Sequence, residues 1–224
     1  MMPLQLALSL TLPDEPSLAN FVMGRNAEAV AQIHEVARGS FGHTALYLWG
    51  ESGAGKTHLL QGLSQLPHAM MGLPEPLLED ATAGAVYLID DVHLLDDAQQ
   101  MALFHLYNRA RANQQKLVLT ANVAPSHLPL SFLPDLKTRL AWDLVYQLQL
   151  LTDENKAQVL EQQAIERGLS LAPDVVPYML RHLTRDLSQL HAILQHLDEY
   201  SLRTKRALTL PLLKEWLSIQ KSIN

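Results

Sequence analysis

The chain has 224 residues, 48% of them hydrophobic, which is enough for one large or two small domains with a sizeable core. Its formal net charge of −6 argues against a broad nucleic-acid-binding surface, because such a surface needs a clustered excess of Lys and Arg. The chain has no cysteine, which excludes disulfides and thiolate metal sites, and no apolar run approaches the ~18 residues of a membrane span. Its N-terminus lacks the basic segment of a signal peptide, so we expect a cytoplasmic protein.

Residues 1–20 form a separate arm in which leucines alternate with other residues. Alternation is the period of an extended strand with one apolar edge, and the prolines at 13 and 16 end the pattern. Two interpretations are open from the pattern alone. The arm is either an edge strand of the main sheet or a peptide that docks on a partner, with alternate side chains in pockets. The alternating residues are Leu4, Leu6, Leu8, Leu10 and Leu12.

A phosphate-binding motif follows the first predicted helix, which spans 27–38. The apolar run 44–49 is rich in strand-forming residues, and residues 58–63 can continue as a helix. Between them, residues 50–57 have the sequence Gly-Glu-Ser-Gly-Ala-Gly-Lys-Thr, which matches the P-loop pattern G-x-x-x-x-G-K-[ST]. This is the strand–loop–helix context that the motif requires.

Each residue type in this loop suits phosphate chemistry. The glycines let the backbone turn its N–H groups inward, and the following helix points its positive end at the same anion. Lys56 adds a charge for the β- and γ-phosphates, and the Thr57 hydroxyl is placed to ligate Mg²⁺. A glycine-rich turn without a ligand is the alternative, which we disfavour because pattern and context both fit the P-loop. The predicted nucleotide-binding residues here are Ser52, Gly53, Ala54, Gly55, Lys56 and Thr57.

Residues 85–91 form an apolar strand that ends in two carboxylates, the shape of a Walker B motif. A buried parallel strand is apolar on both faces, and its carboxyl end opens at the ligand side of the sheet. Asp90 can hold Mg²⁺ through water, and Asp91 can orient or deprotonate the attacking water. The alternative is a pair of helix-capping aspartates, because Asp96 and Asp97 follow and cap the next predicted helix.

That helix is predicted over 97–112, with Met101, Phe104 and Tyr107 on its buried face. The next strand, 116–120, is followed by Asn122, which lies beside the Walker B carboxylates if the two strands are neighbours. Arg139 precedes a further strand at 143–148 and is one arginine among many on the residues alone. From about residue 151 the strand signals stop, and the pattern predicts only helices. The predicted domains are the arm 1–20, an α/β nucleotide-binding domain 21–150 and a helical domain 151–224.

The ordered set of motifs resembles the AAA+ family, and within it the DnaA-like ATPases and most closely the regulatory inactivators of DnaA. The resemblance covers nearly the whole chain and implies an α/β fold: a P-loop core with a five-stranded parallel sheet flanked by helices, plus a small C-terminal all-helical lid. It implies ATP or ADP and Mg²⁺ as cofactors. The segments that carry it are 21–26, similar to the adenine-side box, the P-loop, 90–93, 119–122 at sensor 1, 134–140 at the arginine-finger box and 183–187 at sensor 2.

The resemblance also implies roles for individual residues. Arg25 and Asn26 would bind the adenine side of the nucleotide, and Asp91 and Asn122 would act in hydrolysis. Arg139 would be an arginine finger that reaches the nucleotide of a neighbouring subunit, whereas Arg185 would touch this protein's own nucleotide. The arm is similar to the Q-L-x-L-x-L peptide that binds the sliding clamp, the β subunit of DNA polymerase III, which favours docking. The clamp-binding residues would be Gln5, Leu6, Leu8 and Leu10.

These roles predict a regulator of replication initiation that binds the clamp and an adenine nucleotide and stimulates ATP hydrolysis by the initiator DnaA. The alternative is a DNA-handling AAA+ ATPase, such as a helicase loader or an initiator paralogue. The acidic charge disfavours it, as does the lack of a helix-turn-helix domain, without which we expect no sequence-specific DNA binding. A third hypothesis, a small-molecule P-loop kinase, is disfavoured because this chain shows no acceptor-binding segment between its core strands. Weak ATPase activity of the chain itself and a homodimer stay open.

Overall fold

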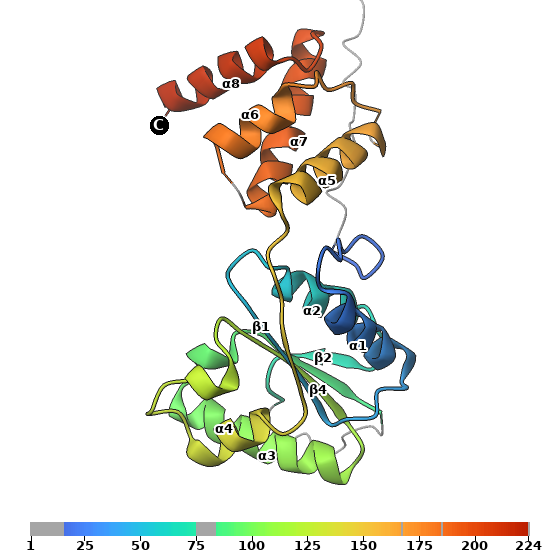
Figure 1. The fold of residues 1–224 in the computed structure, drawn as a ribbon, viewed down its shortest axis with the longest axis vertical. Helices are drawn as coiled ribbons and strands as arrows, with labels where there is room; N and C mark the ends of the chain where they lie inside the picture. Colours follow the sequence, from blue (N-terminus) through green and yellow to red (C-terminus); the bar gives the residue numbers. More distant parts are fainter. Residues whose placement is uncertain (1–15, 75–83, 167, 185, 224) are drawn as a thin grey trace, which may run out of the picture.

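A parallel sheet of five strands in the order β2-β3-β4-β1-β5 forms the centre of the larger domain (Figure 1). The computed structural model describes residues 16–74, 84–166, 168–184 and 186–223. The strands are β1 (Ala45–Trp49), β2 (Ala69–Met71), β3 (Val86–Ile89), β4 (Lys116–Ala121) and β5 (Leu144–Gln147). The helices of this domain are α1 (Ala27–Arg38), α2 (Lys56–Ser64), α3 (Asp97–Ala112) and α4 (Pro134–Leu140), with 3₁₀ turns at Val92–Leu94 and Pro125–His127.

Helices cover both faces of the sheet, because neighbouring residues of each strand point to opposite sides. In β1, Leu46 packs with α1 and α2, whereas Tyr47 packs with α3 and α4. Both side chains are fully buried, and burial of one such side chain contributes about 1.5–3 kcal/mol to folding. The sheet is therefore fixed by two separate apolar layers.

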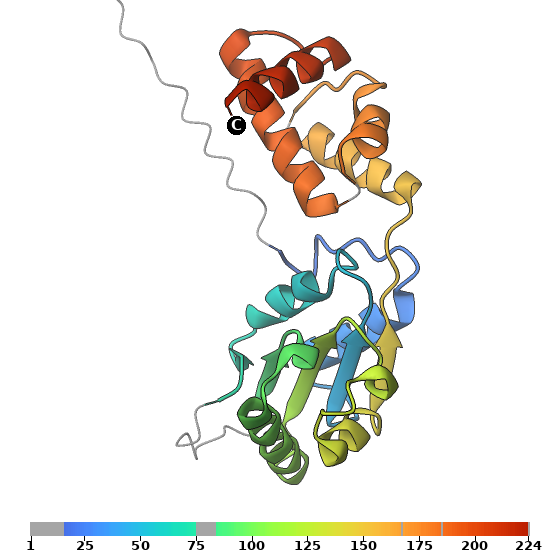
Figure 2. The same cartoon turned by 90° about the vertical axis from the view of Figure 1, so that its left-hand side faces the viewer.

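The strand register brings three chain segments to the carboxyl edge of the sheet. Trp49 pairs with Ala121 across β1 and β4, and Ile89 pairs with Leu119 across β3 and β4. The residues that follow these strands, Gly50, Asp90 and Asn122, therefore meet at one edge. This edge faces the C-terminal domain (Figure 2).

The C-terminal domain, called the lid below, consists of four helices around a core of their own. The linker after β5 leads into it, and Thr152 Oγ1 accepts a 3.2 Å hydrogen bond from Asn155 N in the first turn of α5. Buried leucines such as Leu160, Leu194 and Leu212 form the core. No helix in the described part of the chain is long and apolar enough to cross a membrane. The helices are α5 (Asp153–Glu166), α6 (Val175–His182), α7 (Leu187–Thr204) and α8 (Leu210–Ile223).

The predicted five-stranded parallel sheet with flanking helices and a helical lid is confirmed, whereas the predicted buried face of α3 is wrong at Met101. Met101 is 45% exposed, whereas Tyr107 is buried and Phe104 is partly buried against the same core. Leu103 and Leu106 complete the buried face. In the first turns of α3, the buried position is occupied by Gln100. Its amide donates to Leu95 O and accepts from Leu133 N, both at 2.8 Å, so it fixes two loops rather than filling the core.

Candidate nucleotide-binding site

A cleft of about 670 Å³ lies between the carboxyl edge of the sheet and the lid. The sheet domain contributes the P-loop and the segment before α1, including Phe21 and Val22. The lid contributes Val159 and Gln163 from α5 and His191 and Gln195 from α7. Because the two walls come from different domains, a molecule bound here touches both. The predicted site residues that line the cleft are Asn26, Ser52, Gly53, Ala54, Gly55, Lys56, Thr57, Asp91 and Asn122.

The backbone of the P-loop needs glycine at two positions for steric reasons. A Cβ atom on Gly50 would collide with the carbonyl oxygen of Leu148. At Gly55, φ is 90°, and a Cβ atom would lie 2.7 Å from the ring of Phe21. Gly55 is also the residue from which α2 begins, so the free N–H groups of that helix end open on the loop. These are the features that bind an anion at a helix N-terminus.

Lys56 holds its ammonium group inside the loop. Nζ donates hydrogen bonds to the carbonyl oxygens of Gly50, at 2.8 Å, and Glu51, at 3.0 Å. Burial lowers the pKa of Lys56, and the charges of Asp91 and Asp90 act in the opposite direction. The lysine is therefore positioned by the loop itself and lies near both Walker B carboxylates.

Asp90 is held by two threonines, one of them predicted and one not. Thr57 Oγ1 donates a 2.8 Å hydrogen bond to Asp90 Oδ2, and the hydroxyl of Thr120 donates to Asp90 Oδ1. Thr120 is fully buried in β4 and also accepts from the backbone N–H of Asp91 at 3.0 Å. The sequence analysis missed Thr120. The register of β3 and β4 places it level with Asp90, so a correct strand alignment was the signal that would have found it.

The oxygens of Thr57 and Asp90 fit a hard cation such as Mg²⁺. Mg²⁺ is bound in nucleotide sites through one or two protein oxygens together with phosphates and water. Their separation of 2.8 Å shows that both can face one ion. Among the described residues, no group of three or more His, Asp or Glu side chains could hold a metal without a nucleotide. Thr57 and Asp90 would therefore hold the ion together with the phosphates of a bound nucleotide.

Asp91 and Asn122 line the cleft, whereas Asp90 is not among its lining residues. Asp91 has a left-handed backbone conformation with φ of 49°, which costs a residue other than glycine about 1–3 kcal/mol. Because of this turn, the two carboxylates have different surroundings. Asp90 accepts hydrogen bonds from the two threonines, whereas Asp91 lines the cleft. His93 contacts both Asp91 and Asn122 without lining the cleft itself.

The adenine-side pair separates in the structure. The Asn26 side chain is 4% exposed and is bonded to the backbone of Gln149, in the linker to the lid. Arg25 is exposed and is not among the residues that line the cleft. The segment before them is fastened to α2, where His58 Nε2 lies 3.0 Å from Ser17 O and 2.9 Å from Asn20 Oδ1. This segment thus forms a fixed wall of the cleft.

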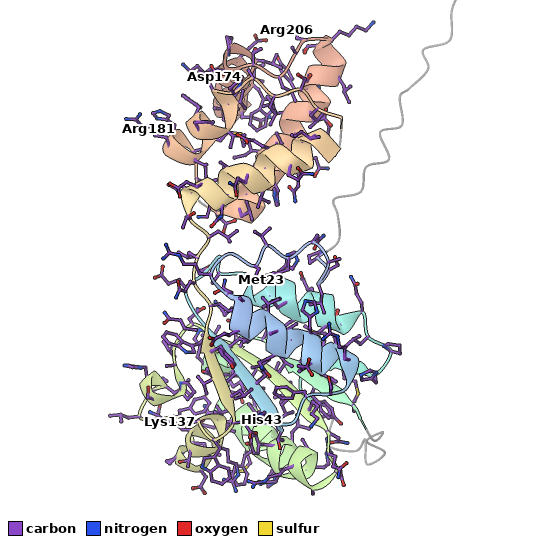
Figure 3. All side chains as sticks on the ribbon, turned by 45° about the vertical axis from the view of Figure 1, so that its right-hand side comes forward. Met23, His43, Lys137, Asp174, Arg181 and Arg206 are labelled. Carbon is purple, nitrogen blue, oxygen red and sulfur yellow. The ribbon has the colours of Figure 1, made fainter. Side chains whose placement is uncertain are left out.

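Arg139 lies outside the cleft, on α4. Its Nε donates a 2.9 Å hydrogen bond to Asn108 Oδ1, and its guanidinium lies 4.2 Å from the ring centre of Phe104 and 5.4 Å from that of Trp142. Figures 1 and 2 place α4 on the part of the sheet domain away from the lid. In Figure 3, Lys137 marks α4, and Arg181 and Arg206 mark the lid at the other end of the molecule. Arg185 and the arm residues Gln5, Leu6, Leu8 and Leu10 lie outside the described residues.

Comparison with solved structures identifies the fold. The chain is similar to domain III of the replication initiation protein DnaA from Thermotoga maritima, with a TM-score of 0.74, 23% identity and coverage of 90% of this chain and 95% of that one. It is similar to AMPPCP-bound DnaA from Aquifex aeolicus, with a TM-score of 0.68, 20% identity and coverage of 84% and 66%. RuvB from Thermotoga maritima is also similar, with a TM-score of 0.67, 14% identity and coverage of 91% and 72%.

Two family models match consecutive parts of the sequence. The bacterial DnaA ATPase domain matches residues 77–147, and the lid domain of Hda matches residues 153–217. With the P-loop core and the cleft under a helical lid, these matches define the class: the chain is a DnaA-like AAA+ protein. Within this class it resembles Hda, the regulatory inactivator of DnaA.

Proposed function

We propose that the chain is a regulator of replication initiation that binds an adenine nucleotide and stimulates ATP hydrolysis by the initiator DnaA. In this proposal Arg139 acts in trans on the nucleotide of the initiator, while the sliding clamp holds the regulator in place. The observation that carries the proposal is the position of Arg139 on α4, outside the cleft of its own chain. A guanidinium there cannot reach the nucleotide of its own chain, but it can serve a neighbour's.

The chain's own site supports binding of ATP or ADP. The loop from Ser52 to Gly55 offers backbone N–H groups to phosphate, and Lys56 adds a positive charge beside them. Mg²⁺, which would be held by Thr57 and Asp90, would neutralise charge on the β- and γ-phosphates when bound. Asp91 lines the cleft and can orient water there, so slow turnover by the chain itself is part of the proposal. The related Aquifex aeolicus DnaA is described with AMPPCP, an ATP analogue.

The surroundings of Arg139 support a role as a finger because they restrict its motion. Nη1 donates to Asp135 O at 3.3 Å in addition to the bond from Nε to Asn108. Stacking on Phe104 and Trp142 further limits the planar guanidinium. A preorganised donor loses less entropy when it meets the developing charge of a transition state. Arginine fingers supplied in trans typically raise the rate of nucleotide hydrolysis by ~10³–10⁵-fold.

Two parts of the proposal rest on the sequence because their residues lie outside the described ones. The arm, with Gln5, Leu6, Leu8 and Leu10, would add its backbone and alternate side chains to the sliding clamp. Arg185, just before the N-cap of α7, would contact the phosphates of the chain's own nucleotide from the lid. The role of Arg185 is supported by its place within the match to the Hda lid domain.

The proposed function is tested by following hydrolysis of ATP bound to DnaA in the presence of DNA loaded with the sliding clamp. Addition of the chain should accelerate turnover, and the double variant Gln5→Ala with Leu6→Ala should not. That variant should fail to capture the clamp in a pull-down but should still bind ADP. The double substitution Leu4→Ala with Leu12→Ala is the matched control at flanking positions. Normal clamp capture by the Gln5 and Leu6 variant would return the arm to the edge-strand interpretation.

A further inference from the structure

His93 sits directly behind two side chains of the cleft. It belongs to the 3₁₀ turn Val92–Leu94, which begins after the left-handed turn at Asp91, and its side chain is only 14% exposed. Its Nδ1 lies 3.9 Å from Asp91 Oδ1 and accepts a 3.4 Å hydrogen bond from the backbone N–H of Asn122. Its Nε2 lies 3.1 Å from Nδ2 of the Asn122 carboxamide. Both ring nitrogens therefore face Asn122, and Nδ1 also faces the carboxylate of Asp91.

The donors and acceptors around the ring fix one arrangement. A neutral imidazole has one acceptor nitrogen and one N–H. The backbone N–H of Asn122 cannot turn away, so Nδ1 is the acceptor and the proton is on Nε2. Nε2–H then needs an acceptor 3.1 Å away, and a half-turn of the carboxamide supplies Asn122 Oδ1 there without any other movement. The amide N–H₂ of Asn122 is then free to face the cleft that this residue lines.

We propose that His93 is a positioning residue that holds Oδ1 of Asn122 and thereby presents the Asn122 amide N–H₂ to the terminal phosphate of ATP. This inference rests on the proposed binding of an adenine nucleotide in the cleft. Asn122 follows β4 at the same edge where Asp90 and Asp91 follow β3, so it lies at the metal-facing end of the nucleotide rather than at the base. ADP lacks the phosphate that this donor would contact. His93 therefore favours ATP over ADP and helps to align the γ-phosphate for turnover.

The test compares the affinities of the full-length chain for AMPPCP and for ADP, both with Mg²⁺, across three substitutions at one position. His93→Leu removes both ring nitrogens and should weaken AMPPCP binding about ten- to hundredfold, the range for one hydrogen bond to a charged group. ADP affinity should stay unchanged, because the P-loop is untouched, and this also shows that the variant is folded. His93→Gln places an N–H near the position of Nε2 and should restore AMPPCP binding, whereas His93→Asn reaches only the position of Nδ1 and should not.

Coupling between the two residues gives a second readout. With Asn122→Ala present, His93→Leu should cause no further loss of AMPPCP affinity, because the side chain that it positions is gone. Three results would overturn the proposal: AMPPCP binding by His93→Leu at the level of the unaltered chain, an equal loss of AMPPCP and ADP binding, or rescue by Asn and not by Gln. If the unaltered chain bound neither nucleotide, the nucleotide site of the proposed function would fail, and this inference would fail with it.

Discussion

The Asn26 side chain is bonded to both backbone groups of Gln149, which lies 123 residues further along the chain. Asn26 Oδ1 accepts from Gln149 N–H at 2.7 Å, and Asn26 Nδ2 donates to Gln149 O at 3.0 Å. The carboxamide thus pairs with the linker as a neighbouring strand would. It joins the wall of the cleft before α1 to the segment that carries the lid.

We therefore expect Asn26→Ala to destabilise the chain. The substitution removes two hydrogen bonds made by a buried side chain, each of which contributes about 0.5–1.5 kcal/mol. Urea unfolding followed by circular dichroism measures the free energy of unfolding, and nucleotide affinity should fall with it as the linker loosens. Asn26→Asp is a second test variant. It keeps an acceptor for Gln149 N–H but places a carboxylate against Gln149 O, so it should also destabilise the chain. If both variants had the same free energy of unfolding as the unaltered chain, the Asn26–Gln149 pair would not stabilise the fold.

Thr120→Val tests whether a buried hydroxyl positions Asp90. Valine has the same shape, but it removes the donor to Asp90 and the acceptor for Asp91 N–H. We expect the Mg²⁺-dependent part of nucleotide affinity to fall, because the carboxylate would no longer be held toward Thr57. The measurement is ADP affinity with Mg²⁺ and with EDTA. Thr120→Ser keeps the hydroxyl and should behave as the unaltered chain. If valine and serine gave the same Mg²⁺ dependence, Thr120 would have no such role.

Lys56→Ala should abolish binding of adenine nucleotides, because it removes the cation that the loop holds next to the phosphate position. A ligand that binds only the folded state raises the melting temperature by mass action, so ADP with Mg²⁺ should shift the unaltered chain and not the variant. Lys116→Ala is a suitable control, since that lysine lies on the sheet outside this cleft. If ADP raised the melting temperature of Lys56→Ala as much as that of the unaltered chain, the nucleotide would have to bind at another site.

Local motifs accounted for the parts of the fold and site that depend on neighbouring residues. The P-loop between β1 and α2 is such a case, because glycine spacing and the flanking apolar runs determine it together. Thr120 and His93 escaped prediction because their roles depend on strand register and on a turn with positive φ. Asn26 was predicted to bind nucleotide and lines the cleft. The pairing of its carboxamide with Gln149 joins distant segments, and no local pattern contains such a contact.

The surface position of Arg139 leads to the strongest prediction. Substitution to alanine removes a group that contacts no residue of the chain's own cleft, so nucleotide affinity and clamp capture should stay at the level of the unaltered chain. Arg139→Lys should be almost as defective in trans as alanine, because an ammonium lacks the planar fork. Arg38→Ala, at an exposed arginine on α1, is the matched control and should retain full function.

The most direct measurement of trans action is the rate of hydrolysis of DnaA-bound ATP with clamp-loaded DNA and each of these variants. The account predicts that the unaltered chain and Arg38→Ala accelerate turnover, whereas Arg139→Ala gives only the rate of DnaA alone, a loss of up to ~10³–10⁵-fold if the finger acts as fingers in trans usually do. Full stimulation by an Arg139→Ala chain that still captures the clamp and binds nucleotide would contradict the trans mechanism.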